Sequence, residues 1–193
     1  MTEEVSQHQW KSLARVVFGV MWGIDAILKW TPAFRSGFLD MVKGAAQGQP
    51  AWLHPWFQFW IWIIAPRQPL FAYSTAVVES IIALSLILGF ARKSAYLLTA
   101  VFGLLIWSTA EGFGGPYTAG ATDIGTGIIY SMAAVFLLAI NGVAGCSRYS
   151  LDAWLESRIA WWPVIAEVGG RRKVVPAPAG PVGTAHTGER ATA

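Results

Sequence analysis

Charged residues are scarce in this chain: they make up 13% of its 193 residues, against roughly 25% in an ordinary soluble domain. A deficit of that size means that much of the protein's surface faces something other than water. Hydrophobic residues reach 54%, and the mean hydropathy is +0.46. The composition therefore argues against a water-soluble enzyme domain and predicts an integral membrane protein.

Cysteine and histidine are also scarce, and this limits the chemistry that the chain can support. The single cysteine, Cys146, cannot form an intrachain disulfide or a dithiol redox couple. The three histidines, His8, His54 and His186, lie outside the long apolar stretches, which argues against a bis-histidine membrane haem. No Cys/His cluster has the spacing of a zinc site. We expect no haem and no metal.

Four apolar stretches approach the roughly 20 residues that a membrane-spanning helix needs. They cover residues 12–30, 72–90, 95–110 and 123–141. The sequence therefore predicts an all-α protein, an integral membrane four-helix bundle within residues 12–148. Residues 1–11 form an N-terminal extension, residues 149–168 are expected to form an interfacial amphipathic helix, and the Gly-, Pro-, Ala- and Thr-rich residues 169–193 a disordered tail.

The basic residues indicate an orientation, because Lys and Arg near helix ends stay in the cytoplasm. Arg92 and Lys93 lie in the turn between the second and third stretches, and several more follow the fourth. We therefore expect a multi-pass protein of the cell membrane with both termini cytoplasmic. Arg35, Lys43 and Arg67 in the long first connection oppose this orientation. The basic residues are scattered rather than gathered in a patch, so the net charge of +3 does not indicate nucleic-acid binding.

Two segments outside the four stretches are amphipathic or aromatic. Residues 54–66 hold three Trp within seven residues and are too short to span, which favours an interfacial or re-entrant segment between the first two helices. His54 in this segment either carries protons or is simply a polar side chain among the Trp residues at the membrane interface. Residues 150–162 predict an amphipathic helix with Leu151, Trp154, Leu155 and Ile159 on its apolar face.

Ionisable residues inside the apolar stretches are costly and often functional. Asp25 and Lys29 are four residues apart on one helix face, in the order that favours an ion pair, so they either neutralise one another or bind a ligand. Glu79 has no basic residue one turn away on its own helix. It must face a neighbouring helix or a water pocket, or be protonated, and it is the strongest functional candidate.

The connection after the third stretch is rich in glycine and carries two acids. Asp123 is suited to cap the fourth helix, whereas Glu111 at a helix C-terminus lies where a negative charge is unfavourable. Close helix packing accounts for two pairs of small residues, Gly19 with Gly23 and Gly127 with Ser131.

The segment Trp107-Ser-Thr-Ala-Glu-Gly-Phe-Gly-Gly-Pro-Tyr117, continued by Gly120-Ala-Thr-Asp-Ile-Gly-Thr126, resembles the outer loop of the DoxD-like family. The patterns Arg15…Gly19…Gly23…Lys29 and Glu79…Leu88-Gly89-Phe-Ala-Arg92 are similar to helices of the broader DoxX-like four-helix membrane proteins. The resemblance covers about residues 12–142. It implies the membrane subunit of a thiosulfate:quinone oxidoreductase, which works with a smaller DoxA subunit and passes electrons from thiosulfate to a membrane quinone, yielding tetrathionate.

The leading hypothesis is a quinone-linked redox subunit in which Glu79, Asp25 and Glu111 exchange protons. Lys29 and Arg67 would hold a small anionic substrate, and His54, Tyr117 and Asp123 are further candidates for binding it. One alternative is a non-catalytic anchor or assembly subunit of a redox complex. Another is a small-solute carrier, which the lack of an inverted repeat disfavours.

Overall fold

The computed structural model describes residues 2–117, 123–144 and 150–169, and all secondary structure in these ranges is helical, as the sequence predicts. The elements are α1 (Thr2–Lys29), α2 (Pro32–Ala45), α3 (His54–Ile64), α4 (Gln68–Leu88), α5 (Arg92–Thr109), α6 (Thr126–Ala144), α7 (Leu151–Glu156) and α8 (Pro163–Ala166). Short 3-10 turns precede α3 (η1, Ala51–Leu53), precede α4 (η2, Ala65–Arg67) and follow α5 (η3, Gly112–Gly114). Cys146 and all but the first residue of the predicted tail 169–193 lie outside the described residues.

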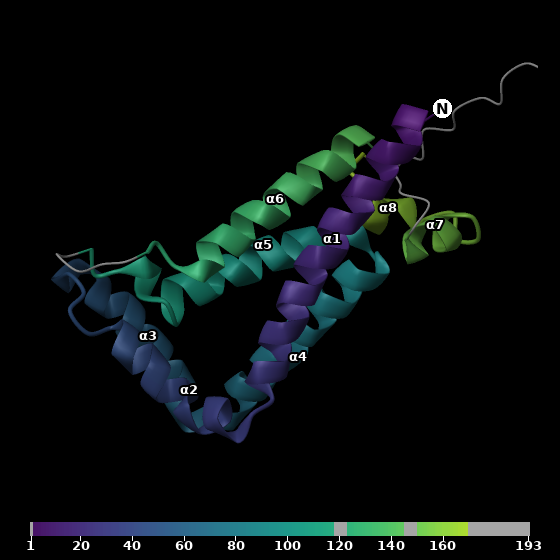
Figure 1. Cartoon of the computed structure of the whole chain (residues 1–193). Coiled ribbons are helices and arrows are strands. Elements are labelled where there is room, and N and C mark those ends of the chain that lie inside the picture. Colours follow the sequence, from purple (N-terminus) through teal and green to yellow (C-terminus); the bar gives the residue numbers. More distant parts are fainter. Residues whose placement is uncertain (1, 118–122, 145–149, 170–193) are drawn as a thin grey trace, which may run out of the picture.

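The long helices form two pairs, α1 with α4 and α5 with α6. The pairs come together near α7 and α8 and diverge toward their other ends, where α2 and α3 lie between them (Figure 1). A core cluster that includes Phe18, Trp22, Ile82, Leu86 and Tyr96 fills the convergent part. A smaller cluster, Phe38, Val42, Ile64 and Ala72, joins α2, α3 and α4 at the divergent part. The wedge between the pairs is thus closed at one end by packed side chains.

Small residues set the distance within each pair. A Cβ at Gly19 would lie 2.9 Å from the backbone nitrogen of Ile87, so only glycine allows α1 to approach α4 this closely. Gly23 is less constrained, because its nearest neighbour would be 3.9 Å away. In the other pair, the hydroxyl of Ser131 donates to Ala100 O at 2.9 Å, and a Cβ at Gly127 would lie 2.6 Å from Gly103 O. Tight packing is confirmed for Gly19, Gly127 and Ser131.

The four predicted stretches overlap α1, α4, α5 and α6, each extending one to three residues beyond one end of its helix. Only part of the chain meets the requirements of a membrane span. Two helical stretches of the described residues, Ala51–Leu88 and Thr126–Val143, are long and apolar enough to cross a membrane. The first includes the aromatic segment, because α3 continues through η2 into α4.

Sequence analysis missed α2, although its start carries a clear signal. Pro32 occupies the first turn, where its missing N–H costs nothing, and the Thr31 side chain accepts from Phe34 N at 3.3 Å. The first long connection is therefore helical in both halves, with α2 and α3 packed against each other.

The amphipathic helix expected over residues 150–162 is shorter than predicted. Within this range α7 ends at Glu156 and turns follow, and α8 begins only at Pro163. Of the predicted apolar face, Leu151 and Trp154 are 38% and 51% exposed, whereas Asp152 is fully buried. The segment docks through its acids because a buried cation, Arg92, lies opposite them.

Arg92 at the start of α5 holds this C-terminal segment against the bundle. Its Nε donates to Asp152 Oδ2 at 2.8 Å, and its Nη2 contacts Glu156 at 3.4 Å and Glu167. Asp152 also accepts from Ala91 N and from the indole N–H of Trp162. Three carboxyl groups thus converge on one guanidinium. We call Arg92, Asp152, Glu156 and Glu167 the Arg92 cluster.

We expect the docking of α7 and α8 to weaken as the pH rises through neutrality. Burial raises the pKa of Glu167 to about 7; Arg92 opposes this shift and Glu156 adds to it. A carboxyl group whose pKa is raised by folding stabilises the folded state below its unfolded pKa of 4.5, and this contribution is lost as the pH rises through about 7. Hydrogen exchange of residues 150–167 should therefore be faster at pH 8 than at pH 6 after correction for intrinsic rates. Glu167→Gln should remove this dependence, and an unchanged dependence in that variant would rule out Glu167 as its source.

Candidate functional site

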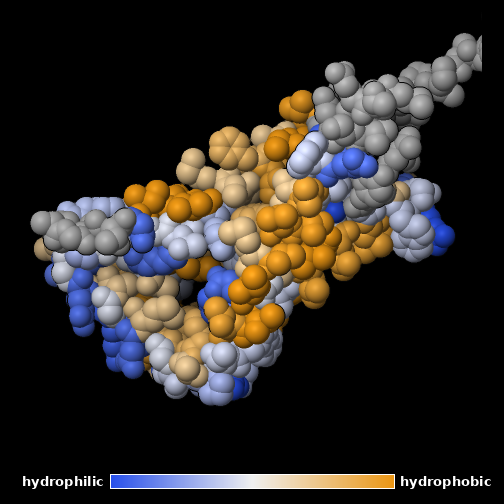
Figure 2. Space-filling view, viewed as in Figure 1, coloured by the Kyte–Doolittle hydropathy of each residue, from blue (hydrophilic) through white to orange (hydrophobic). Residues whose placement is uncertain are grey.

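A cavity of about 560 Å³ lies where the two helix pairs diverge, and its lining comes from α1 to α6. The volume is within the range of pockets that bind small organic molecules. Figure 2 shows the molecule hollowed between the pairs, with hydrophilic atoms at the edge of the hollow and hydrophobic residues around them. The lining is mostly apolar and aromatic, and four ionisable side chains reach it: Asp25, Lys29, Glu79 and Glu111.

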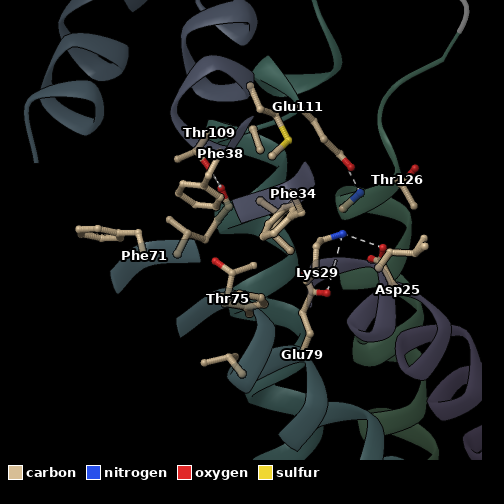
Figure 3. A pocket seen from close by; sticks show the side chains of 18 of the residues that line it. Asp25, Lys29, Phe34, Phe38, Phe71, Thr75, Glu79, Thr109, Glu111 and Thr126 are labelled. Atoms are coloured by element: carbon tan, nitrogen blue, oxygen red, sulfur yellow. Dashed lines mark hydrogen bonds and ion pairs between the residues drawn. The ribbon is translucent and has the colours of Figure 1, made fainter. Parts of the chain in front are cut away.

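Three of these side chains form a chain of charges across the α1–α4 contact (Figure 3). Lys29 Nζ lies 2.7 Å from Asp25 Oδ1, one helical turn earlier on α1, which confirms that the two are in contact. The same nitrogen lies 3.8 Å from Glu79 Oε2 on α4 and 5.3 Å from the centre of the Phe34 ring. One ammonium therefore faces two carboxyl groups and an aromatic face.

Glu79 is the most constrained of the four. Its side chain is fully buried, and no described residue donates a hydrogen bond to either of its carboxyl oxygens. A buried carboxylate without hydrogen bonds is costly, so a group retained in this state is a candidate for ligand contact. The sequence prediction that Glu79 faces another helix or a pocket is confirmed on both counts.

Two indole N–H groups in the lining are likewise without an acceptor among the described residues. They belong to Trp22, which is 1% exposed, and to Trp60 on α3. Buried Trp N–H groups usually have a partner. Both residues line the cavity, and their N–H groups, like the Glu79 carboxyl group, have hydrogen-bonding capacity that no described residue uses. Sequence analysis missed both residues, because in a chain with eleven Trp no local pattern separates these two from the others.

Glu111 reaches the cavity from the turn after α5, but it also has a structural role. Its Oε2 accepts from Gly127 N at 2.8 Å, in the first turn of α6. The carboxylate thus lies at the positive end of the α6 dipole, where it is favourable. The sequence predicts an unfavourable position for the Glu111 carboxylate at the C-terminal end of α5. The N-terminal end of α6 compensates for this, because it places positive partial charge next to the carboxylate. Asp123, the predicted cap, accepts instead from Gly125 N at 2.8 Å, just before the helix.

The remaining predicted binding residues do not line the cavity. His54 Nε2 lies 3.1 Å from Gln49 O, and Tyr117 is 63% exposed with its hydroxyl bonded to Phe113 O at 2.5 Å. Arg67 is exposed in η2, and Asp123 is exposed before α6. The structure brings together Asp25, Lys29, Glu79 and Glu111, and leaves these four outside.

The glycine-rich motif after α5 closes the divergent end of the wedge by packing on α3. Phe113 adopts a φ of +60° and places its ring against Trp56, Phe57 and Trp107. The Trp56 indole donates to Ser108 O at 2.7 Å, and Gln49 Nε2 donates to Gly112 O at 2.9 Å. These contacts give the motif a structural role. Residues 118–122 of its second part lie outside the described residues.

Comparison with known proteins gives no match: no family model, no curated protein and no solved structure is similar to this chain. Within the described ranges, no group of three or more His, Cys, Asp or Glu could hold a metal ion. The chemistry of the cavity therefore has to be argued from its own residues.

Proposed function

We propose that this chain is a membrane protein whose helices α1, α4, α5 and α6 cross the cell membrane, with both termini on the cytoplasmic side. Two of these helices, α1 and α5, are not apolar enough to count as membrane spans. Their exposed faces nevertheless support the proposal. On α1 the charged Arg15 is 3% exposed, whereas the large side chains facing outward are apolar over four turns. On α5 the exposed large residues are Leu97, Leu98, Val101 and Leu104. Arg15 on α1 and Arg92 on α5 lower the average hydropathy of these helices but are buried, so lipid would meet a largely apolar surface.

Within that membrane protein, we propose that the cavity binds a quinone and that the chain is a subunit of a quinone-linked oxidoreductase. A quinone has two carbonyl oxygens that accept hydrogen bonds and a flat ring that packs on aromatic faces. The N–H groups of Trp22 and Trp60 are donors without acceptors, Lys29 adds a charged donor, and Phe34, Phe38 and Tyr130 supply rings in the lining. The apolar cavity with a few polar groups is suited to such a ligand.

Reduction of a quinone to a quinol takes two electrons and two protons, one proton on each ring oxygen. Glu79 is placed to deliver protons inside the cavity, and Asp25, whose side chain is 33% exposed, connects it to water through Lys29. In line with the DoxD-like resemblance, we propose that the electrons come from two thiosulfate ions, which lose one electron each and join through a new S–S bond as tetrathionate. A second protein subunit would carry these electrons to the quinone.

The observation that carries this proposal is that Glu79, Trp22 and Trp60 line one cavity, while the Glu79 carboxyl oxygens and the two indole N–H groups have no hydrogen-bond partner among the described residues. The test is binding of a ten-carbon-tailed benzoquinone to the purified protein in nanodiscs. Trp60→Phe should raise the Kd by about five- to tenfold, the value of one lost hydrogen bond. Trp52→Phe is the matched control, because Trp52 is 76% exposed and does not line the cavity.

Two outcomes would contradict the proposal. Wild-type protein that binds no quinone would leave the cavity without the proposed ligand. If Trp60→Phe and Trp52→Phe change the Kd equally, the quinone binds at another part of the surface. Co-purification of a stoichiometric redox partner together with absent quinone binding would favour the alternative of a non-catalytic anchor or assembly subunit.

A further inference from the structure

The face of α1 that lines the cavity has two edges of opposite character. Trp22, Asp25 and Lys29 form the inner edge, at helical spacings of three and four residues, and Lys29 on this edge faces Glu79. Met21, Ile24 and Leu28 form the outer edge one residue earlier in each turn. The charged groups of α1 in the lining are therefore on the inner edge, beside the buried Trp22, and Met21, Ile24 and Leu28 are on the outer edge.

The outer-edge residues line the cavity and are also exposed on the protein surface. Met21, Ile24 and Leu28 are 43%, 59% and 56% exposed, and Met41 on α2, another lining residue, is 37% exposed. Two further lining residues, Ser74 and Thr126, are exposed and polar, so only the α1–α2 side of the cavity rim is apolar. Met21, Ile24, Leu28 and Met41 form this side. We call these four residues the apolar mouth. In Figure 2 hydrophobic residues border the hollow on the side of α1.

An apolar mouth is unsuited to a ligand that arrives from water, because its approach would bring polar groups past hydrophobic side chains. On the proposed topology, the outer surface of α1 faces lipid, and the mouth opens into the hydrocarbon region. A ligand dissolved in the bilayer would then enter sideways, with its head group moving across α1 toward Lys29 and Glu79. A hydrocarbon tail would remain between Met21, Ile24, Leu28 and Met41.

We infer that the cavity takes its ligand laterally from the membrane, and that the apolar mouth holds the hydrocarbon tail of a long-chain amphiphile. This inference rests on the proposed function and extends it: the substrate is a quinone with a tail, and the four mouth residues determine tail specificity. Thiosulfate and other small anions do not use this route, and their electrons reach the ring from elsewhere.

The test compares Ile24→Trp with Ile27→Trp. Both residues are exposed on α1, but Ile27, at 70% exposure, does not line the cavity. The probes are two quinones with the same ring, one without a tail and one with a ten-carbon tail, and the readout is the Kd of each in nanodiscs. Extra bulk in a packed contact is unfavourable, so Ile24→Trp should raise the Kd of the tailed quinone by about tenfold. The tail-less quinone should change by less than about twofold, and Ile27→Trp should affect neither probe.

Leu28→Trp provides a second variant at the mouth and should have the same tail-dependent effect. If both mouth variants weaken the two quinones equally, or weaken neither, the lateral mouth is overturned while the quinone site stands. If the wild-type protein binds neither quinone, the proposed function itself fails, and the inference fails with it.

Discussion

Replacement of Glu79 with glutamine is expected to lower thiosulfate-dependent quinone reduction by about 10²- to 10⁴-fold, the contribution typical of a positioned proton donor. Glutamine preserves the size of the side chain and the polarity of its end but cannot exchange a proton. Glu79 is the fully buried acid of the cavity, with Lys29 Nζ 3.8 Å from its Oε2. The measurement is the initial rate of quinone reduction by this chain together with the proposed second subunit.

The same substitution should leave the unfolding temperature unchanged or raise it. A buried carboxyl group that receives no hydrogen bond contributes little to folding, and a neutral side chain of similar volume removes its desolvation cost. Lys29 keeps its 2.7 Å contact with Asp25. Loss of activity without loss of stability identifies a residue kept for function.

The control for this prediction is Asp40→Asn. It also removes one carboxylate, but the Asp40 side chain is 80% exposed on α2 and lies outside the cavity. Its activity should match the wild type within about twofold. A Glu79→Gln variant with full activity would remove Glu79 from the mechanism. A Glu79→Gln variant that unfolds at a clearly lower temperature would assign Glu79 a structural role instead.

Replacement of Arg92 with methionine is expected to be the most destabilising of the changes considered. It should lower the free energy of unfolding by about 3–5 kcal/mol, the usual cost of removing one partner from a buried ion pair. Arg92 is 3% exposed, and its loss leaves Asp152, Glu156 and Glu167 close together without their cation. The buried carboxyl groups would then repel one another, and α7 with α8 would detach from the α4–α5 turn.

Chemical unfolding in detergent and limited proteolysis of residues 150–169 measure the two consequences. Arg158→Met is the control, because Arg158 belongs to the same segment and is exposed, with its guanidinium 4.0 Å from the centre of the Trp154 ring. It should change stability by less than about 0.5 kcal/mol. Lower pH should partly rescue Arg92→Met, since protonation removes the repulsion between the acids. A cleavage pattern identical to the wild type would show that the segment is held by other contacts.

Sequence periodicity and composition were informative wherever a helix has a long apolar face. The helical class and the positions of α4, α5 and α6 follow from such faces, and the ends of these helices lie within four residues of the prediction. The i, i+4 spacing of Asp25 and Lys29 also led directly to their contact. Sequence reasoning failed at α2, whose charged and small residues form no long apolar run, and over residues 150–162, where the predicted helix ends at Glu156.

The sequence by itself determined that this chain is apolar and helical, and it singled out Glu79 as an acid that needs an unusual environment. Only the tertiary structure decided what that environment is. The divergence of the two helix pairs creates the cavity, and the contact of α1 with α4 brings Lys29 to Glu79. Contacts between residues distant in sequence also place Glu111 on α6 and the acids of α7 on Arg92. Local spacing cannot encode these pairings, because each depends on which helices pack together and at what distance.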